Sequence, residues 1–276
     1  MHRTAPLPPT ASARPGPTAR PRRRASSQRD INVLARGLLR HALSATILVL
    51  LVGAAAPLTA ADDDPFAAAR ERMVAQQVIE RGVRAPAVLA AMNTVPRHLF
   101  VPETERDRVY ADQPVEIGRD QTLPQAYISA RMIELLDLEP GARVLEIGTG
   151  SGYEAALLGQ LAAQVYTIEI DEELGQRARS TLAAQGYTNV RVKIGDGYRG
   201  WPDAAPFDAI LLTAAPETVP KPLLDQLRIG GRMVVAVGNV FQDLKLITKT
   251  ADGTEAKRVI PVRLAPMEGE IRRQRR

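Results

Sequence analysis

The chain has 276 residues, a formal net charge of +5 and no cysteine. Without cysteine there are no disulfides, no thiolate catalysis and no cysteine-ligated metal. Only one of the three histidines, His98, lies beyond residue 61. A histidine metal site or a serine–histidine triad therefore has almost nothing to be built from, and we expect no metal.

The positive charge is confined to the start of the chain. Residues 1–61 hold nine arginines, no lysine and one acid, Asp30, so this leader carries +8 and the remainder carries −3. The high isoelectric point comes from the leader, so we expect no nucleic-acid partner for the folded part. The basic run 271–276 is interpreted as a solvated tail.

The leader resembles an export signal. An apolar run at 42–56 follows arginines, is shorter than the roughly 20 residues that span a bilayer, and precedes small residues and an acidic start at 62–64. This order predicts a signal peptide cleaved after Ala60 or Ala61. We expect an exported, periplasmic protein that meets the membrane only transiently. The alternatives are an uncleaved anchor, a buried helix, or a true start downstream of Met1 and a cytoplasmic protein.

Residues 62–276 are expected to form a single domain, with an N-terminal helical cap at 62–140 and a ligand-binding core at 141–270. Helical spacing of apolar residues predicts a helix over 65–83, ended by Gly82, and a second over 85–92. The polar stretch 110–123 is expected to be a loop. Pro124 suits the first turn of a helix that runs to residue 138.

The core alternates short β-rich runs with helical stretches. Strands are predicted at 143–147, 165–170, 190–194, 207–213 and 232–237, with helices at 154–163, 172–185 and 220–227. This alternation indicates an α/β fold with a doubly wound, mostly parallel sheet. The runs 244–250 and 258–264 predict an antiparallel C-terminal hairpin at the sheet edge.

A glycine loop, Gly148-Thr149-Gly150-Ser151-Gly152, lies between the first core strand and its helix. Glycine allows the backbone to approach a ligand closely, and ligands of such sheets lie at the carboxyl ends of the strands. The dinucleotide fingerprint requires glycine at position 153, where Tyr153 stands instead. Glu146, just before the loop, is expected to hold the loop amides or to face a cationic ligand group.

Two further acids end the next strands. Glu169 is placed to accept hydrogen bonds from ribose hydroxyls, and Asp196, before Gly197, from an adenine amino group. Either acid alone equally suits a solvated strand end. Three acids in register, with Glu146, favour a nucleoside ligand.

These residues resemble the protein-L-isoaspartate O-methyltransferase family from about residue 73 to residue 271. The matching segments are VPRHLFVP at 95–102, QT at 121–122 before Tyr127, the glycine loop, GDG at 195–197, Trp201, PFDAI at 206–210, TAAP at 213–216, VG at 237–238 and VRL at 262–264. The resemblance implies a Rossmann-like methyltransferase sheet and methyl transfer from S-adenosyl-L-methionine. The substrate it implies is the α-carboxylate of L-isoaspartyl residues in damaged proteins or peptides.

The resemblance also implies roles for particular residues. Expected to bind the cofactor are Gln121, Gly148, Thr149, Gly150, Ser151, Gly152, Glu169, Asp196 and Gly197. Gln121 to Pro124 are expected to cover the site, and this four-residue segment is called the cap below. Ser129, Ala265 and Glu268 are expected on the substrate side. His98 and Trp201 are expected to have structural roles.

The chain departs from the family pattern in the cap, where Pro124 replaces a serine near the reacting groups. Proline supplies neither hydroxyl nor amide donor, so Thr122 and Ser129 are the candidate substitutes. Two alternatives remain open. One is a methyltransferase of the same fold that acts on another carboxylate or a small molecule. The other is a non-catalytic relative that binds a nucleoside or a damaged peptide.

Overall fold

The computed structural model describes residues 64–273. The expected signal peptide at 1–61 and the last three residues of the basic tail lie outside these residues. All described residues belong to one compact unit. Within them, no helix combines the length and apolar character needed to cross a bilayer.

A seven-stranded sheet forms the centre of this unit, in the order β5-β4-β3-β6-β7-β8-β9. The pairs among β5, β4, β3, β6 and β7 are parallel, and β8 and β9 continue the sheet antiparallel. The expected mostly parallel sheet and its C-terminal hairpin are confirmed. The strands are β3 (Arg143–Ile147), β4 (Gln164–Glu169), β5 (Val190–Ile194), β6 (Phe207–Leu212), β7 (Leu227–Gly238), β8 (Gln242–Thr250) and β9 (Gly253–Val262).

The order of the strands reverses at β3. The chain moves outward from β3 through β4 to β5, and then returns across β3 to place β6 on its other side. Ligands of doubly wound sheets bind beside the carboxyl ends of the strands at such a reversal. The glycine loop directly follows β3 and therefore stands at this point.

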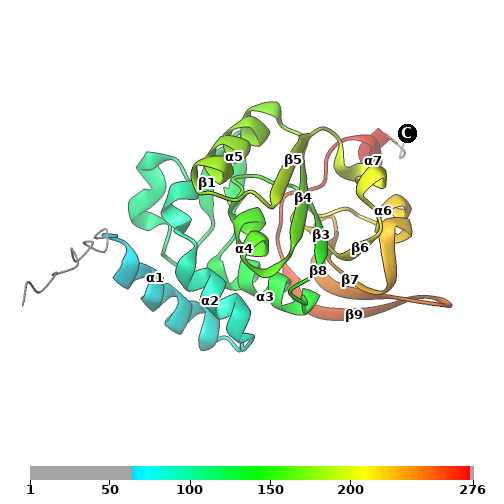
Figure 1. Cartoon of the computed structure of the whole chain (residues 1–276), viewed down its shortest axis with the longest axis horizontal. Coiled ribbons are helices and arrows are strands. Elements are labelled where there is room, and N and C mark those ends of the chain that lie inside the picture. The colour runs from blue at the N-terminus through cyan, green and yellow to red at the C-terminus, as the bar shows by residue number, and fades with distance from the viewer. Residues whose placement is uncertain (1–63, 274–276) are drawn as a thin grey trace, which may run out of the picture. The chain divides into compact units, whose positions relative to one another are not determined.

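Helices cover both faces of the sheet (Figure 1). On one face, α3 (Ala126–Leu136), α4 (Tyr153–Leu161) and α5 (Glu172–Ala184) cover residues such as Val144. On the other, α6 (Lys221–Gln226), α7 (Glu270–Arg273) and the 3₁₀ turns η4 (Gly197–Arg199) and η5 (Pro202–Ala204) cover residues such as Leu145. The central strands β3, β4 and β6 are buried on both faces, so apolar residues predominate in them.

The N-terminal part packs on the α3–α4 face. It contains α1 (Ala67–Met73), the π-helical η1 (Val74–Ile79), α2 (Pro86–Thr94) and the 3₁₀ turns η2 (Arg97–Phe100) and η3 (Glu103–Arg108). The expected first helix thus changes to π-helical hydrogen bonding at Val74 and ends before Gly82, whose φ is +97°. The expected second helix is α2.

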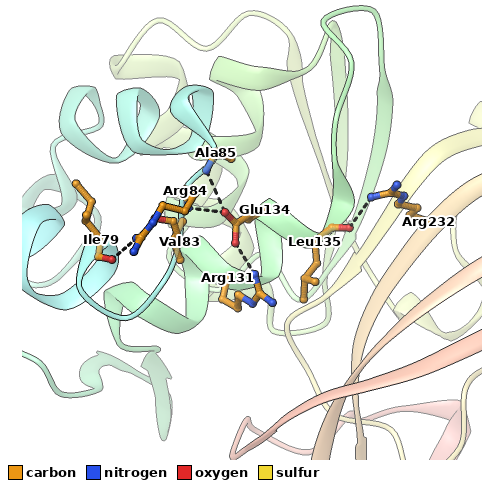
Figure 2. Close-up of polar contacts among 8 residues, drawn as sticks. All are labelled: Ile79, Val83, Arg84, Ala85, Arg131, Glu134, Leu135 and Arg232. Atoms are coloured by element: carbon orange, nitrogen blue, oxygen red, sulfur yellow. Dashed lines mark hydrogen bonds and ion pairs between the residues drawn. The ribbon is translucent and has the colours of Figure 1, made fainter.

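Glu134 of α3 joins the N-terminal part to the core (Figure 2). Its Oε1 accepts hydrogen bonds from the backbone N–H groups of Arg84 (2.6 Å) and Ala85 (3.0 Å), and its Oε2 accepts from Arg131 (2.5 Å). Ala85 is the N-cap of α2 and has no side chain that can cap the helix. Glu134 instead accepts from the N–H of the N-cap residue itself, as the glutamate of a capping box does, but it comes from another helix.

The prediction of a loop over 110–123 is wrong. The segment contains a small hairpin, β1 (Val115–Gly118) and β2 (Gln121–Leu123). Its apolar residues alternate inward, and its two-residue turn uses the left-handed conformation at Arg119 (φ 59°) and Asp120 (φ 55°). Such turns usually carry asparagine or glycine, so residues 119–120 do not predict one. The next helix begins at Ala126 rather than at Pro124.

Candidate active site

A cavity of about 1240 Å³ opens at the carboxyl edge of the sheet. Four segments form most of its lining: the glycine loop, the β1–β2 hairpin with the residues up to Gln125, residues 168–171 at the end of β4, and the segment 261–268. Eleven of the predicted site residues lie in its lining: Gln121, Thr122, Pro124, Gly148, Thr149, Gly150, Ser151, Glu169, Gly197, Ala265 and Glu268. A more open hollow of about 760 Å³ lies beside α6 and contains none of the predicted residues.

Gly148 begins the loop in a conformation that suits glycine alone. Its φ is +98°, and a Cβ there would collide with the Thr213 hydroxyl. That hydroxyl donates to the carbonyls of Ile147 and Gly148. The end of β6 therefore packs directly on the loop, which brings the backbone of residues 148–150 to the cavity surface.

Glu169 holds the centre of the loop. Its Oε2 accepts a hydrogen bond from the Gly150 N–H (2.7 Å), and its Oε1 accepts from the Asp171 N–H (3.0 Å). Each carboxylate oxygen has further acceptor capacity, and the side chain lines the cavity. The arrangement is compatible with the expected role toward ribose hydroxyls, which stays a prediction.

Glu146 was expected to hold the loop amides or to face the ligand, and the structure places it away from both. The side chain is fully buried and accepts a hydrogen bond from the Thr167 hydroxyl (2.6 Å), which in turn lies 2.6 Å from the Thr149 hydroxyl. Burial raises the pKa of Glu146 well above its ordinary value, and the nearby Glu154 adds to this. Glu146 thus supports the loop through two hydroxyls.

Asp196 is engaged with the C-terminal end of the chain. Its Oδ1 accepts from the Tyr198 N–H (2.9 Å), and its Oδ2 accepts from the Glu270 N–H (2.6 Å), which begins α7. Asp196 is not part of the cavity lining, although its neighbour Gly197 is. The predicted contact with an adenine amino group remains untested.

The cap is fixed from two sides. The buried Arg97 donates from Nη2 to the Pro124 carbonyl and from Nε to the Val109 carbonyl (3.0 Å). At the other end of the β1–β2 hairpin, Arg119 pairs with Asp171 at 2.8 Å. Pro124 therefore contributes its carbonyl to the fold, and it lies in the cavity lining at the position where the family serine is expected.

The two candidate substitutes for that serine are placed differently. Thr122 is exposed on β2 and lines the cavity. Ser129 is buried outside the cavity lining, and its hydroxyl donates to Glu154 Oε1 at 2.6 Å. Ser129 can reach the cavity only through Glu154.

Glu154 was not singled out from the sequence. It stands in the first turn of α4, lines the cavity and is almost fully buried. Burial raises the pKa of Glu154, while the Ser129 hydrogen bond and the charge of Arg97 lower it. Glu154 directly follows Tyr153, two residues after the glycine loop, where an acid is common in the first turn of a helix. The sequence therefore did not indicate that Glu154 lines the cavity.

The motif at 213–216 positions the segment that contains Ala265 and Glu268, which are expected on the substrate side. Ala215 N–H donates to the Ala265 carbonyl (2.7 Å), and Met267 N–H donates back to the Ala215 carbonyl (2.8 Å). Pro216 accepts from Gly238 N–H at 3.1 Å. The end of β6 thereby positions Ala265 and, one residue beyond Met267, Glu268.

His98 and Trp201 have the structural places expected from the sequence. His98 Nδ1 lies 2.9 Å from the Tyr110 hydroxyl, its ring packs against Phe66, and burial lowers its pKa. Trp201 packs edge-on against Tyr166. Among residues 64–273 no group of histidine and acidic side chains could hold a metal ion.

The switch-point cavity, the glycine loop and the acid after the second core strand together define a Rossmann-like methyltransferase domain. Comparison with known families then narrows the class. The family model of protein-L-isoaspartate(D-aspartate) O-methyltransferase matches residues 68–271. The chain belongs to this family.

Similar proteins carry the same name. The chain is 55% identical over 212 residues to a protein-L-isoaspartate O-methyltransferase of a Synechococcus species, covering 74% of this chain and 87% of that one. It is 49% identical over 234 residues to one of Opitutus terrae, covering 84% and 99%. A solved protein-L-isoaspartate O-methyltransferase superposes with a TM-score of 0.67 at 27% identity, covering 75% of this chain and 69% of that one.

Proposed function

We propose that this chain transfers a methyl group from S-adenosyl-L-methionine to the α-carboxylate of L-isoaspartyl residues in damaged proteins and peptides. The observation that carries the proposal is one cavity lined on one side by the glycine loop and Glu169 and on the other by the cap and the segment 261–268. Membership in the family and about 50% identity to relatives of that name supply the substrate.

The residues present fit the cofactor. Backbone at Gly148 and Gly150 forms a surface without side chains, and a Cβ at Gly197 would come within 2.5 Å of Ile147. Glu169 offers acceptors to vicinal hydroxyls, while Gln121 and Thr122 close the cavity from the cap. These residues hold the nucleoside and amino-acid parts, and the cofactor supplies a methyl group activated by a positive sulfonium.

The chain's own contribution to the reaction is alignment and exclusion of water. The substrate carboxyl has a pKa of about 4 and is already an anionic nucleophile at neutral pH, so it requires no general base. Holding two reactants in line is by itself a large rate factor. This explains how a cavity whose lining, in the described part of the chain, contains no histidine supports the reaction.

Pro124 alters the positioning of the substrate rather than the chemistry. The serine expected at this place contributes one hydrogen bond, worth roughly 1 kcal/mol. Thr122 lines the same cavity and carries a hydroxyl, so it is the better placed substitute. Unchanged methylation of an isoaspartyl peptide by Thr122→Val would rule out this role.

The proposal is tested with purified protein and cofactor carrying a labelled methyl group. Three acceptors are compared: an isoaspartyl peptide, the same peptide with ordinary aspartate, and small carboxylic acids. We expect a base-labile methyl ester on the isoaspartyl peptide alone. Methylation of a small acid instead would favour the other methyltransferase. Binding of S-adenosyl-L-homocysteine in calorimetry without any methylation would favour the non-catalytic relative.

We also propose that residues 1–61 direct export and that residues 62–276 form the mature, periplasmic domain. The support is the order of basic, apolar and small residues before Asp62. Sequencing the N-terminus of the protein recovered from a periplasmic fraction tests this. A mature protein that starts at Asp62 or Ala61 is expected. Two results contradict the proposal: a cytoplasmic protein that still contains residues 42–56, and a protein whose N-terminus is a methionine downstream of Met1.

A further inference from the structure

The turn between β7 and β8 exposes two large apolar side chains. Val240 is 80% exposed and Phe241 is 92% exposed, more than any other large hydrophobic residue described by the structure. Exposure of a whole phenylalanine ring to water is unfavourable, and burial of the ring against a partner would release free energy. Adjacent exposed apolar side chains beside a hollow are typical of a binding surface.

The turn is rigidly built. Gly238 N–H donates to the Pro216 carbonyl, and a Cβ at Gly238 would collide with the Phe241 carbonyl. Gln242 is 6% exposed and forms two hydrogen bonds with the Leu264 backbone, Nε2 to O at 3.0 Å and N–H to Oε1 at 2.7 Å. A surface held in this way binds without a large loss of conformational entropy.

The turn adjoins the wall of the cavity. Gln242, which ends the turn, pairs with Val262 of β9, and Val262 and Arg263 both line the cavity. Arg263 is exposed and forms no ion pair within residues 64–273. The cavity wall next to the apolar turn therefore carries a positive charge that no acid among residues 64–273 neutralises in an ion pair.

We propose that Val240 and Phe241 dock the polypeptide segment that flanks the isoaspartyl residue, and that they select substrates with an apolar side chain near that residue. The inference rests on the proposed function, because it needs a polypeptide substrate. The isoaspartyl residue enters the cavity, its carboxylate is attracted by Arg263, and the flanking chain continues over the rim to the turn.

A second copy of this chain is a weaker candidate for the occupant. A stable dimer buries about 800 Å² on each partner, whereas the exposed apolar surface here consists of two side chains. A polypeptide with one apolar residue next to the isoaspartate needs no larger surface. Charge also favours it, since the substrate brings an anion toward Arg263.

The experiment compares the wild type with a Val240→Ser/Phe241→Ser double variant on isoaspartyl peptides. One peptide series has leucine at each neighbouring position in turn, and the reference peptide has serine there. The control is Ile229→Ser. Ile229 is 63% exposed, but it lies in the first part of β7, and neighbouring Leu227 pairs with Phe207 at the start of β6, at the edge opposite the cavity.

We expect the wild type to have a KM about tenfold lower for the best leucine peptide than for the serine peptide, the size expected for partial burial of such side chains. The double variant should lose this preference, with kcat and the dissociation constant for S-adenosyl-L-homocysteine unchanged. Ile229→Ser should retain it. A wild type without the preference, a double variant that keeps it, or an equal loss in Ile229→Ser overturns the inference.

Sedimentation of the wild type and the double variant tests whether a second copy of the chain occupies the turn instead. A wild-type dimer that becomes a monomer in the double variant overturns docking of the substrate and assigns the turn to self-association. Failure of the proposed function looks different, since the wild type would then methylate neither the leucine nor the serine peptide.

Discussion

Replacing Glu134 by alanine should detach the start of α2 from α3. The change removes the acceptor for the backbone N–H groups of Arg84 and Ala85 and the partner of Arg131 (Figure 2). The bond to Ala85 is partly buried, and a hydrogen bond to a charged group there is worth about 1.5–3 kcal/mol. The bond from the Arg84 N–H is exposed and the Arg131 pair is partly buried, and each adds about 0.5 kcal/mol. The free energy of unfolding should therefore fall by roughly 2.5–4 kcal/mol.

Urea unfolding at neutral pH measures this loss, and Glu139→Ala, an exposed acid beyond the end of the same helix, is the control for lost charge. Although burial opposes it, the backbone donors and Arg131 hold the pKa of Glu134 below its ordinary value. Its stabilisation is thus present above the unfolded pKa and is lost as pH falls through the folded one. A loss below about 0.5 kcal/mol, or a difference from wild type that persists unchanged into strong acid, would refute the reasoning.

Three further predictions concern the site and its support. Glu169→Ala should weaken binding of S-adenosyl-L-homocysteine about hundredfold, as expected for two lost hydrogen bonds to a carboxylate, whereas the exposed Glu173→Gln should not; equal affinities in calorimetry would contradict this. Glu146→Gln should gain stability relative to the wild type as pH rises above about 4.5, because burial raises the folded pKa of Glu146 and ionisation then favours the unfolded chain. A difference in melting temperature between variant and wild type that is the same in acidic and basic buffers would contradict this. Arg97→Met should lower stability by about 3 kcal/mol and kcat/KM for the isoaspartyl peptide, since it leaves two carbonyls without a donor; a variant with wild-type unfolding and kinetics would show that the cap needs no anchor.

The sequence predicts the centre of the sheet well because β3, β4 and β6 are buried on both faces. A strand covered on both sides must be apolar at nearly every position, as in Val144 and Leu145. The glycine loop is equally predictable, because Gly148 has a φ of +98° and a Cβ cannot be fitted there.

What the sequence could not provide depends on contacts between distant segments. The β1–β2 hairpin turns at Arg119 and Asp120, which have no preference for that conformation, and it is held in place by Arg119 pairing with Asp171. Glu169, rather than Glu146, reaches the Gly150 amide, because the packing of β3 against β4 determines which acid lies beside the loop. Glu154 gains its hydrogen-bond partner only when α3 brings Ser129 beside it.

Arg97 has a consequence for how the protein can be divided. Its side chain extends from the N-terminal part to the Pro124 carbonyl and lies 4.7 Å from the centre of the Tyr153 ring, at the first residue of the helix after the glycine loop. A fragment that begins after Tyr110 would keep Pro124 and Tyr153 but lose the guanidinium that contacts both. Residues 64–110 are therefore not an interchangeable module. Chimaeras with relatives should be joined before Asp64 rather than between residues 110 and 121.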